Sequence, residues 1–234
     1  MIKANGRQQV AIFIYFRFMQ SHELSFEFKA RYFTLGELTS STTAIWIVLH
    51  GYGQLASYFI RRFDLLSRNN IYVIAPEALS RFYVDPLLST GRTSDRVGAT
   101  WMTKENRLVD IENYLSYLDT LYAHLNLPST LPVTVLGFSQ GAATASRWIA
   151  GGKIRFNRMI LWSGVFPPDM NFAPAKEILK GKEIAFVYGK SDPFLNDSSY
   201  HSMEMISTKL EIHPQLIPFE GGHEILEETL KKLF

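Results

Sequence analysis

Residues 133–143 read V-T-V-L-G-F-S-Q-G-A-A, and they carry the strongest indication of the fold. The apolar run is typical of a buried strand, and the small residues after Ser139 are typical of a helix that packs closely. Between strand and helix, the serine would sit on a sharp, strained turn that exposes its hydroxyl. Gly137 and Gly141 suit this turn because side chains there would clash as strand and helix approach. A plain helix start with Ser139 as N-cap is the alternative, and the flanking pattern favours a nucleophile.

Further apolar runs lie on both sides of this segment, with helical patterns between them. Continuous apolar runs indicate strands buried on both faces, as in a parallel sheet covered by helices. The predicted strands are residues 45–49, 71–75, 133–136, 159–162, 184–188 and 214–219. The predicted helices are residues 55–66, 108–125, 140–150, 197–210 and 224–233. This alternation predicts an α/β fold with a mostly parallel central sheet and helices on both faces.

The N-terminal region follows a different pattern. Residues 24–32 alternate between apolar and polar side chains, which predicts a half-buried antiparallel edge strand. Residues 10–16 are apolar but far too few to span a bilayer. We expect residues 1–18 to be an extension and residues 19–234 to form one domain, although a signal peptide stays an open alternative.

Composition excludes several classes of function. The net charge is +2 and no block of like charge occurs, which argues against a nucleic-acid surface or a polybasic membrane patch. The chain contains no cysteine, so disulfides, thiolate metal sites and a cysteine nucleophile are excluded. We expect a cytoplasmic protein without stable membrane insertion, with export by an N-terminal signal left open. The sequence does not predict the oligomeric state.

A serine hydroxyl needs a base to take its proton, and six histidines are available. His223 lies in a glycine loop, F-E-G-G-H-E, directly after the last predicted strand. Asp192, in Y-G-K-S-D-P-F, follows the strand at 184–188 and lies between the serine and the histidine. Serine, acid and histidine then come in the chain order of α/β-hydrolases. The weaker candidates for the acid are Asp169, Asp197 and Glu220.

Acyl transfer also needs two backbone N–H donors aimed at the developing oxyanion. One comes from the residue after the nucleophile, Gln140, and the other from the loop after the first buried strand. That loop reads L-H-G-Y-G at residues 49–53, and Tyr52 is the natural donor. We expect His50 to hold the loop in place.

The same glycines allow a rival interpretation. Residues 51–56 match G-x-G-x-x-A after a strand, and Glu77 follows the next strand, which together form a dinucleotide fingerprint. A dinucleotide-binding oxidoreductase would leave the serine, the acid and the histidine without a role. A non-catalytic binding protein is the other alternative, and the complete triad argues against it.

These segments resemble the phospholipase/carboxylesterase family, which includes the acyl-protein thioesterases. The similarity covers roughly residues 45–234 and rests on L-H-G-Y-G, I-A-P-E-A, Trp101, G-F-S-Q-G, S-G-V-F, S-D-P and G-G-H. It implies an α/β-hydrolase fold with no large cap domain, and hydrolysis of small-molecule carboxylic esters without cofactor or metal. An acyl thioesterase or a lysophospholipase would use the same triad. The residues it implies are Ser139, Asp192 and His223 for the triad, with Tyr52 and Gln140 for the oxyanion hole.

Substrate contacts are predicted from the long segment 78–103, which we expect to be an irregular loop over the carboxyl ends of the strands. We expect Phe82, Tyr83 and Trp101 to contact substrate. Without a cap domain, the site would suit short-to-medium acyl chains. The alternative is that these side chains only pin the loop to the core, Trp101 in particular.

Overall fold

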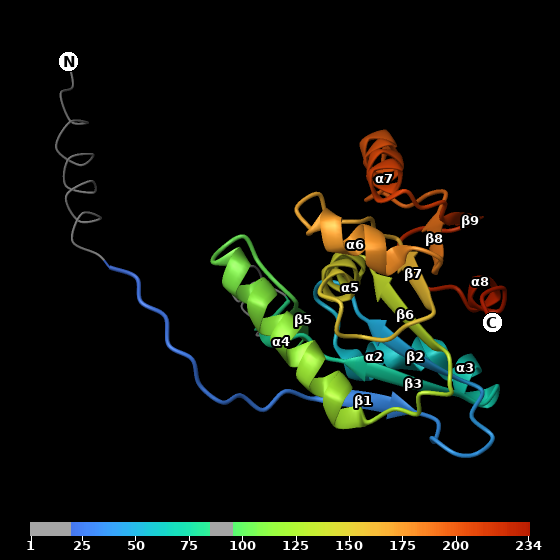
Figure 1. Ribbon diagram of the computed structural model, residues 1–234, viewed down its shortest axis with the longest axis horizontal. Helices are drawn as coiled ribbons and strands as arrows, with labels where there is room; N and C mark the ends of the chain where they lie inside the picture. The colour runs from blue at the N-terminus through green and yellow to red at the C-terminus, as the bar shows by residue number, and fades with distance from the viewer. Residues whose placement is uncertain (1–19, 85–95) are drawn as a thin grey trace.

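A computed structural model describes residues 20–84 and 96–234 of the chain. Its strands are β1 (Tyr32–Leu35), β2 (Ala44–Leu49), β3 (Ile71–Pro76), β4 (Ser80–Tyr83), β5 (Val97–Thr100), β6 (Val133–Phe138), β7 (Arg158–Trp162), β8 (Glu183–Gly189) and β9 (Gln215–Phe219). Within the described residues, seven of them form a central sheet in the order β1-β3-β2-β6-β7-β8-β9 (Figure 1). Only β1 runs antiparallel to its neighbour. The predicted mostly parallel sheet is confirmed.

Helices cover both faces of the sheet, each over its own hydrophobic core. Their bounds are α2 (Ala56–Phe59), the 3₁₀ helix η1 (Ile60–Phe63), α3 (Asp64–Arg68), α4 (Arg107–Leu125), α5 (Gln140–Ala150), α6 (Phe172–Leu179), α7 (Asp197–Leu210) and α8 (Glu227–Leu230). Side chains of α4, α5, α6 and α7 contribute to one core. Those of α2, η1, α3 and α8 contribute to the other. The predicted covering of both faces is therefore confirmed.

The six predicted buried strands all occur, and the predicted helices at 140–150 and 197–210 coincide with α5 and α7. The predicted helix at 55–66 is divided into three short segments, and the one at 224–233 is reduced to the single turn of α8. Helix α6 was not predicted; its first turn contains Pro174, which suits a helix start but weakens the helical signal in the sequence.

The predicted edge strand at 24–32 is wrong. The strand at this edge is β1, and Leu24 and Phe26 upstream of it are 88% and 75% exposed. Pairing begins at Tyr32, which lies opposite Pro76, the last residue of β3. Residues before Tyr32 have no continuing strand to pair with, and alternation alone cannot supply a missing neighbour.

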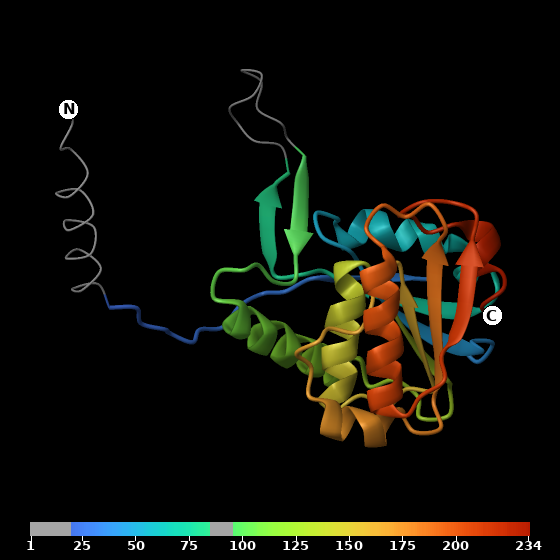
Figure 2. The same cartoon turned by 90° about the horizontal axis from the view of Figure 1, so that it is seen from above.

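The prediction of an irregular segment at 78–103 is also wrong for its described part. Strands β4 and β5 pair antiparallel as a two-stranded sheet that stands apart from the central one (Figure 2). Residues 85–95 lie outside the described residues, as does the predicted extension at 1–18. The proposed domain division stays a prediction.

Close contact between α5 and β2 fixes the centre of the fold. A Cβ atom on Gly141 would lie 2.2 Å from the carbonyl oxygen of Leu49, and one on Gly137 would lie 2.3 Å from the carbonyl oxygen of Gly141. Both separations are far shorter than van der Waals contact, so any side chain at these positions would force the backbone apart. The first turn of α5 is thereby held against the end of β2.

We expect Gly141→Ala to lower the free energy of unfolding by about 1–3 kcal/mol, because the added methyl overpacks backbone atoms. Helix propensity alone would predict the opposite sign, since alanine in a helix is favoured over glycine by about 0.5–1 kcal/mol. The measurement is urea unfolding. Gly151→Ala is the matched control, because its Cβ would approach no atom closer than 3.2 Å. Equal stability of the two variants would contradict the packing argument.

Candidate active site

The backbone at Ser139 is strained. Its φ of 54° and ψ of −118° lie outside the regions that ordinary residues favour. Its N–H donates to the carbonyl oxygen of Trp162 at 2.9 Å, which ties the turn to the end of β7. The side chain makes no capping hydrogen bond to α5, so the N-cap alternative is not supported. Ser139 stays partly exposed between two buried elements.

Asp192 and His223 are joined by a hydrogen bond. The Nδ1–H of His223 donates to Oδ2 of Asp192 at 2.8 Å, and the other carboxylate oxygen accepts the N–H of Phe194 at 2.9 Å. Asp192 is 5% exposed. A buried carboxylate on Nδ1 fixes the imidazole tautomer and leaves Nε2 free to accept a proton.

The loops that carry these two residues are bound to one another. Backbone hydrogen bonds run from Ser191 to Gly221 at 3.0 Å and from Lys190 to Phe219 at 2.9 Å. The His223 ring lies 4.9 Å from the ring of Phe138, the residue before the serine. Ser139, Asp192 and His223 thus follow the carboxyl ends of β6, β8 and β9, with His223 beside the residue that precedes the serine.

The other candidate acids are engaged elsewhere. Burial would raise the pKa of Asp169, but its hydrogen bonds and ion pairs with Arg147 and Arg107 outweigh that and lower the pKa. Glu220 pairs with Lys190 at the surface. Asp197 lies in the first turn of α7, whose N-cap is Asn196.

The loop before α2 lies against the nucleophile. A Cβ on Gly51 would be 3.2 Å from Cβ of Ser139. The N–H of Gly51 donates to Oε1 of Gln54 at 2.8 Å, and that of Gly53 donates to Ala99 at 2.9 Å. Across residues 20–84 and 96–234, the N–H groups of Tyr52 and Gln140 donate to no acceptor. These two predicted oxyanion donors are thus available.

Sequence reasoning missed the role of the Gln140 side chain. Its Nε2 donates to Oγ1 of Thr100 at 3.0 Å and to the carbonyl oxygen of Met102 at 2.9 Å. Its Oε1 accepts the N–H of Trp101 at 3.1 Å. The amide therefore fastens the end of β5 to the residue that follows the nucleophile. Only the residue type, a long amide directly after the serine, hinted at this.

Trp101 lies beneath the site. Its Nε1–H donates to the carbonyl oxygen of His50 at 2.8 Å, and the side chain is 3% exposed. It offers almost no surface to a substrate, so the predicted substrate contact is replaced by a role in holding the loop. Phe82 lies 5.1 Å from the ring of Tyr52, and Tyr83 is 62% exposed. Their contacts with substrate stay predictions.

His50 holds the loop, as its position in the sequence suggested. Its Nδ1–H donates to the carbonyl oxygen of Gly51 at 2.8 Å, and its Nε2 accepts the N–H of Ala78 at 3.1 Å. Burial lowers its pKa to about 4, although the hydrogen bond to Gly51 and the charge of Glu77 act in the opposite direction. His50 is a neutral, fully bonded residue.

The dinucleotide interpretation requires a free acid at Glu77. The structure buries this side chain, where it accepts the N–H of Ala56 at 3.2 Å and forms ion pairs with Arg31 and Arg81. Glu77 is therefore occupied in joining three segments, and it does not face a ribose. No group of three histidines or acids that could hold a metal occurs within the described residues.

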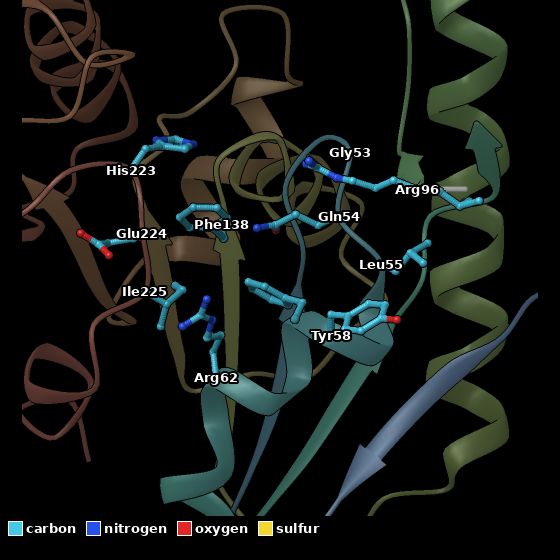
Figure 3. A pocket seen from close by; sticks show the side chains of 12 residues that line it. Gly53, Gln54, Leu55, Tyr58, Arg62, Arg96, Phe138, His223, Glu224 and Ile225 are labelled. Atoms are coloured by element: carbon cyan, nitrogen blue, oxygen red, sulfur yellow. The ribbon is translucent and has the colours of Figure 1, made fainter. Parts of the chain in front are cut away.

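A cavity of about 680 Å³ opens beside His223 (Figure 3). It lies between the loop at 53–55, the helical segment of α2 and η1, and the loop that follows β9. Its lining residues are Gly53, Gln54, Leu55, Tyr58, Phe59, Arg62, Arg96, Val97, Phe138, His223, Glu224 and Ile225.

The sheet order and the placement of the site define an α/β-hydrolase, and solved structures share this fold. Zea mays acyl-protein thioesterase 2 superposes with a TM-score of 0.66 at 18% identity, covering 88% of this chain and 96% of that one. Esterase PE8 gives 0.62 at 21% identity, covering 88% and 96%. A phospholipase/carboxylesterase from Dyadobacter fermentans gives 0.60 at 14% identity, covering 89% and 96%. These likenesses concern the fold.

Residues 41–229 match the family described as Serine hydrolase (FSH1), and the chain belongs to that family. The predicted resemblance to phospholipase/carboxylesterases is confirmed at the level of fold. No curated protein sequence matches the chain. In the part of the chain that the structure describes, no helix has the length and apolarity needed to cross a membrane.

The lowered pKa of His50 gives a test by pH. Below about 6.5 an unfolded histidine takes up a proton, whereas folded His50 stays neutral until about pH 4. The stability that His50 contributes is therefore fully present above pH 6.5 and is lost as the pH falls towards 4. The free energy of unfolding should fall by up to about 1.4 kcal/mol per pH unit in this window. His50→Phe leaves the N–H of Ala78 unpaired and should cost about 1–3 kcal/mol at pH 7.

The measurement is urea unfolding of wild type and variant between pH 7 and pH 4. Other titrating groups cancel in the difference between the two proteins, which should shrink as the pH falls. A difference that stays constant over this window would show that His50 titrates alike in both states.

Proposed function

We propose that this serine hydrolase cleaves carboxylic esters through an acyl-enzyme on Ser139. The observation that carries the proposal is the hydrogen bond between buried Asp192 and His223 beside the strained serine. In this proposal Nε2 of His223 takes the serine proton during attack on the ester carbonyl. The same nitrogen then returns the proton to the leaving alcohol. Asp192 stabilises the imidazolium and holds its orientation.

The tetrahedral intermediate carries a negative oxygen. We assign its stabilisation to the N–H groups of Tyr52 and Gln140, which lie on two different loops. These loops are held by the Gln54 and Gln140 side chains and by the Trp101 indole. Donors fixed before the reaction need no reorganisation, and removal of one such donor costs about 10²–10³-fold in turnover in other acyl-transfer enzymes.

The substrate class we propose is a small-molecule ester with a short-to-medium acyl chain. Within the described residues no cap domain covers the cavity beside His223, so a long acyl chain would not be enclosed there. None of the proposed steps uses a cofactor or a metal. A thioester or a lysophospholipid could react with the same triad. A cytoplasmic location stays a prediction from the sequence.

Kinetics of single variants test the triad. Ser139→Ala should lose about four to six orders of magnitude in kcat, because triad members act as a unit. Asp192→Asn should lose about four, because it destroys control of the His223 tautomer. Asp197→Asn is the matched control, since that acid lies at the surface in the first turn of α7. If Asp197→Asn is the more damaging variant, the assignment of the acid is wrong.

Acyl length tests the substrate class. For p-nitrophenyl esters, each methylene buried in the cavity adds about 0.8 kcal/mol of binding, so kcat/KM should rise through short chains and then level off once the cavity is filled. A rise that continues through long chains, with activity on emulsified lipid, would indicate a lipase. Cleavage of thioesters in preference to matched oxygen esters would keep the triad and replace the substrate class.

A further inference from the structure

The cavity beside His223 combines apolar walls with positive charge. Its apolar surface comes from Leu55, Phe59, Val97, Phe138 and Ile225. Two arginines, Arg62 of η1 and Arg96 directly before β5, line it as well. A neutral alkyl chain makes no use of a guanidinium group, whereas an anionic ligand would form charge-assisted hydrogen bonds with one.

Arg62 is the informative cation. Among the described residues, no carboxylate forms an ion pair with it and no acceptor takes a hydrogen bond from it. The nearby arginines on the same helical segment are engaged differently. Arg68 pairs with Asp64, and the guanidinium of Arg61 lies 4.9 Å from the centre of the Tyr58 ring.

The orientation of Arg62 agrees with a binding role. Figure 3 shows its side chain rising from the helical segment, with the guanidinium directed towards Phe138 and Ile225 at the cavity. Glu224 also lines the cavity, but its carboxylate points away from the other labelled side chains and accepts the N–H of Gly222 at 3.5 Å. The Glu224 carboxylate therefore does not lie against the Arg62 guanidinium.

We propose that the cavity selects an ester that carries a carboxylate a few bonds from the scissile bond, and that Arg62 binds this carboxylate. The inference rests on the proposed ester hydrolysis and narrows its substrate class. Arginine presents a planar fork of donors that matches a carboxylate in bidentate geometry, and such charge-assisted hydrogen bonds are stronger than neutral ones. The apolar walls between His223 and Arg62 would hold the methylenes that join the two ends.

Two pairs of probes separate charge from shape. In the first pair the carboxylate is on the acyl side: p-nitrophenyl hydrogen adipate against p-nitrophenyl methyl adipate. In the second pair the carboxylate is on the alcohol side: 3-carboxyphenyl butyrate against the same butyrate with its ring carboxyl group methylated. The measured quantity is the ratio of kcat/KM for the anionic ester to that for its neutral partner. We compare wild type, Arg62→Gln, Arg62→Lys and the matched control Arg68→Gln.

We expect wild type to favour the anionic ester in at least one pair. Arg62→Gln should reduce that ratio about 10- to 100-fold, as expected for loss of a hydrogen bond to a charged group. Arg62→Lys should keep part of the ratio, Arg68→Gln should keep all of it, and added salt should lower it in wild type. Substitution at an exposed arginine has little effect on folding, and the ratio cancels any remaining loss of active enzyme.

A wild-type ratio of about one in both pairs would overturn the inference. So would a preference for the anionic ester that Arg62→Gln leaves unchanged. Either result would leave the proposed ester hydrolysis standing, because the neutral esters would still be cleaved. If no ester of either pair is hydrolysed in a way that depends on Ser139, the proposed function fails together with the inference.

Discussion

The fold depends on one close contact, between the first turn of α5 and the end of β2. Gly141 allows this contact because any side chain there would meet the backbone oxygen of Leu49 at 2.2 Å. The contact sets the tight turn between β6 and α5, and the turn holds Ser139 in a strained conformation with its hydroxyl accessible. The hydrogen bond from the Ser139 N–H to the carbonyl oxygen of Trp162, at the end of β7, fixes the turn from the other side. Strain of this kind persists only where the surrounding structure determines the backbone from several directions.

Around this turn, the site is held by buried polar contacts between segments far apart in sequence. The Gln140 amide binds the end of β5, the Trp101 indole binds the His50 carbonyl, and the His50 ring joins its own loop to Ala78. The loop that carries Asp192 and the loop that carries His223 are joined by backbone hydrogen bonds. Within the residues that the structure describes, the N–H groups of Tyr52 and Gln140, the two proposed oxyanion donors, donate to no acceptor. An arrangement fixed before substrate binds is what electrostatic stabilisation of an oxyanion requires.

Much of this could be predicted from sequence because the decisive signals are local. A strand followed by G-F-S-Q-G predicts the turn, and the order of Ser139, Asp192 and His223 along the chain predicts which loops meet. Sequence patterns failed where a segment packs against or pairs with a distant part of the chain. Alternation at 24–32 could not reveal that β3 ends opposite Tyr32, and the apolar residues of 78–103 gave no sign of a separate hairpin. Trp101 looked like a substrate contact because its hydrogen bond to a backbone oxygen cannot be inferred from residue types.

Covalent labelling shows which serine is the nucleophile. The folded protein is treated with a fluorophosphonate, digested, and analysed by mass spectrometry to locate the adduct. We expect one adduct per chain, on Ser139, and much slower formation in His223→Ala, because that variant lacks the base that activates the serine. A useful comparison is Ser163, also at positive φ but with a buried hydroxyl. An adduct on Ser163 or any other serine, or no adduct while ester hydrolysis proceeds, would show that Ser139 is not the nucleophile.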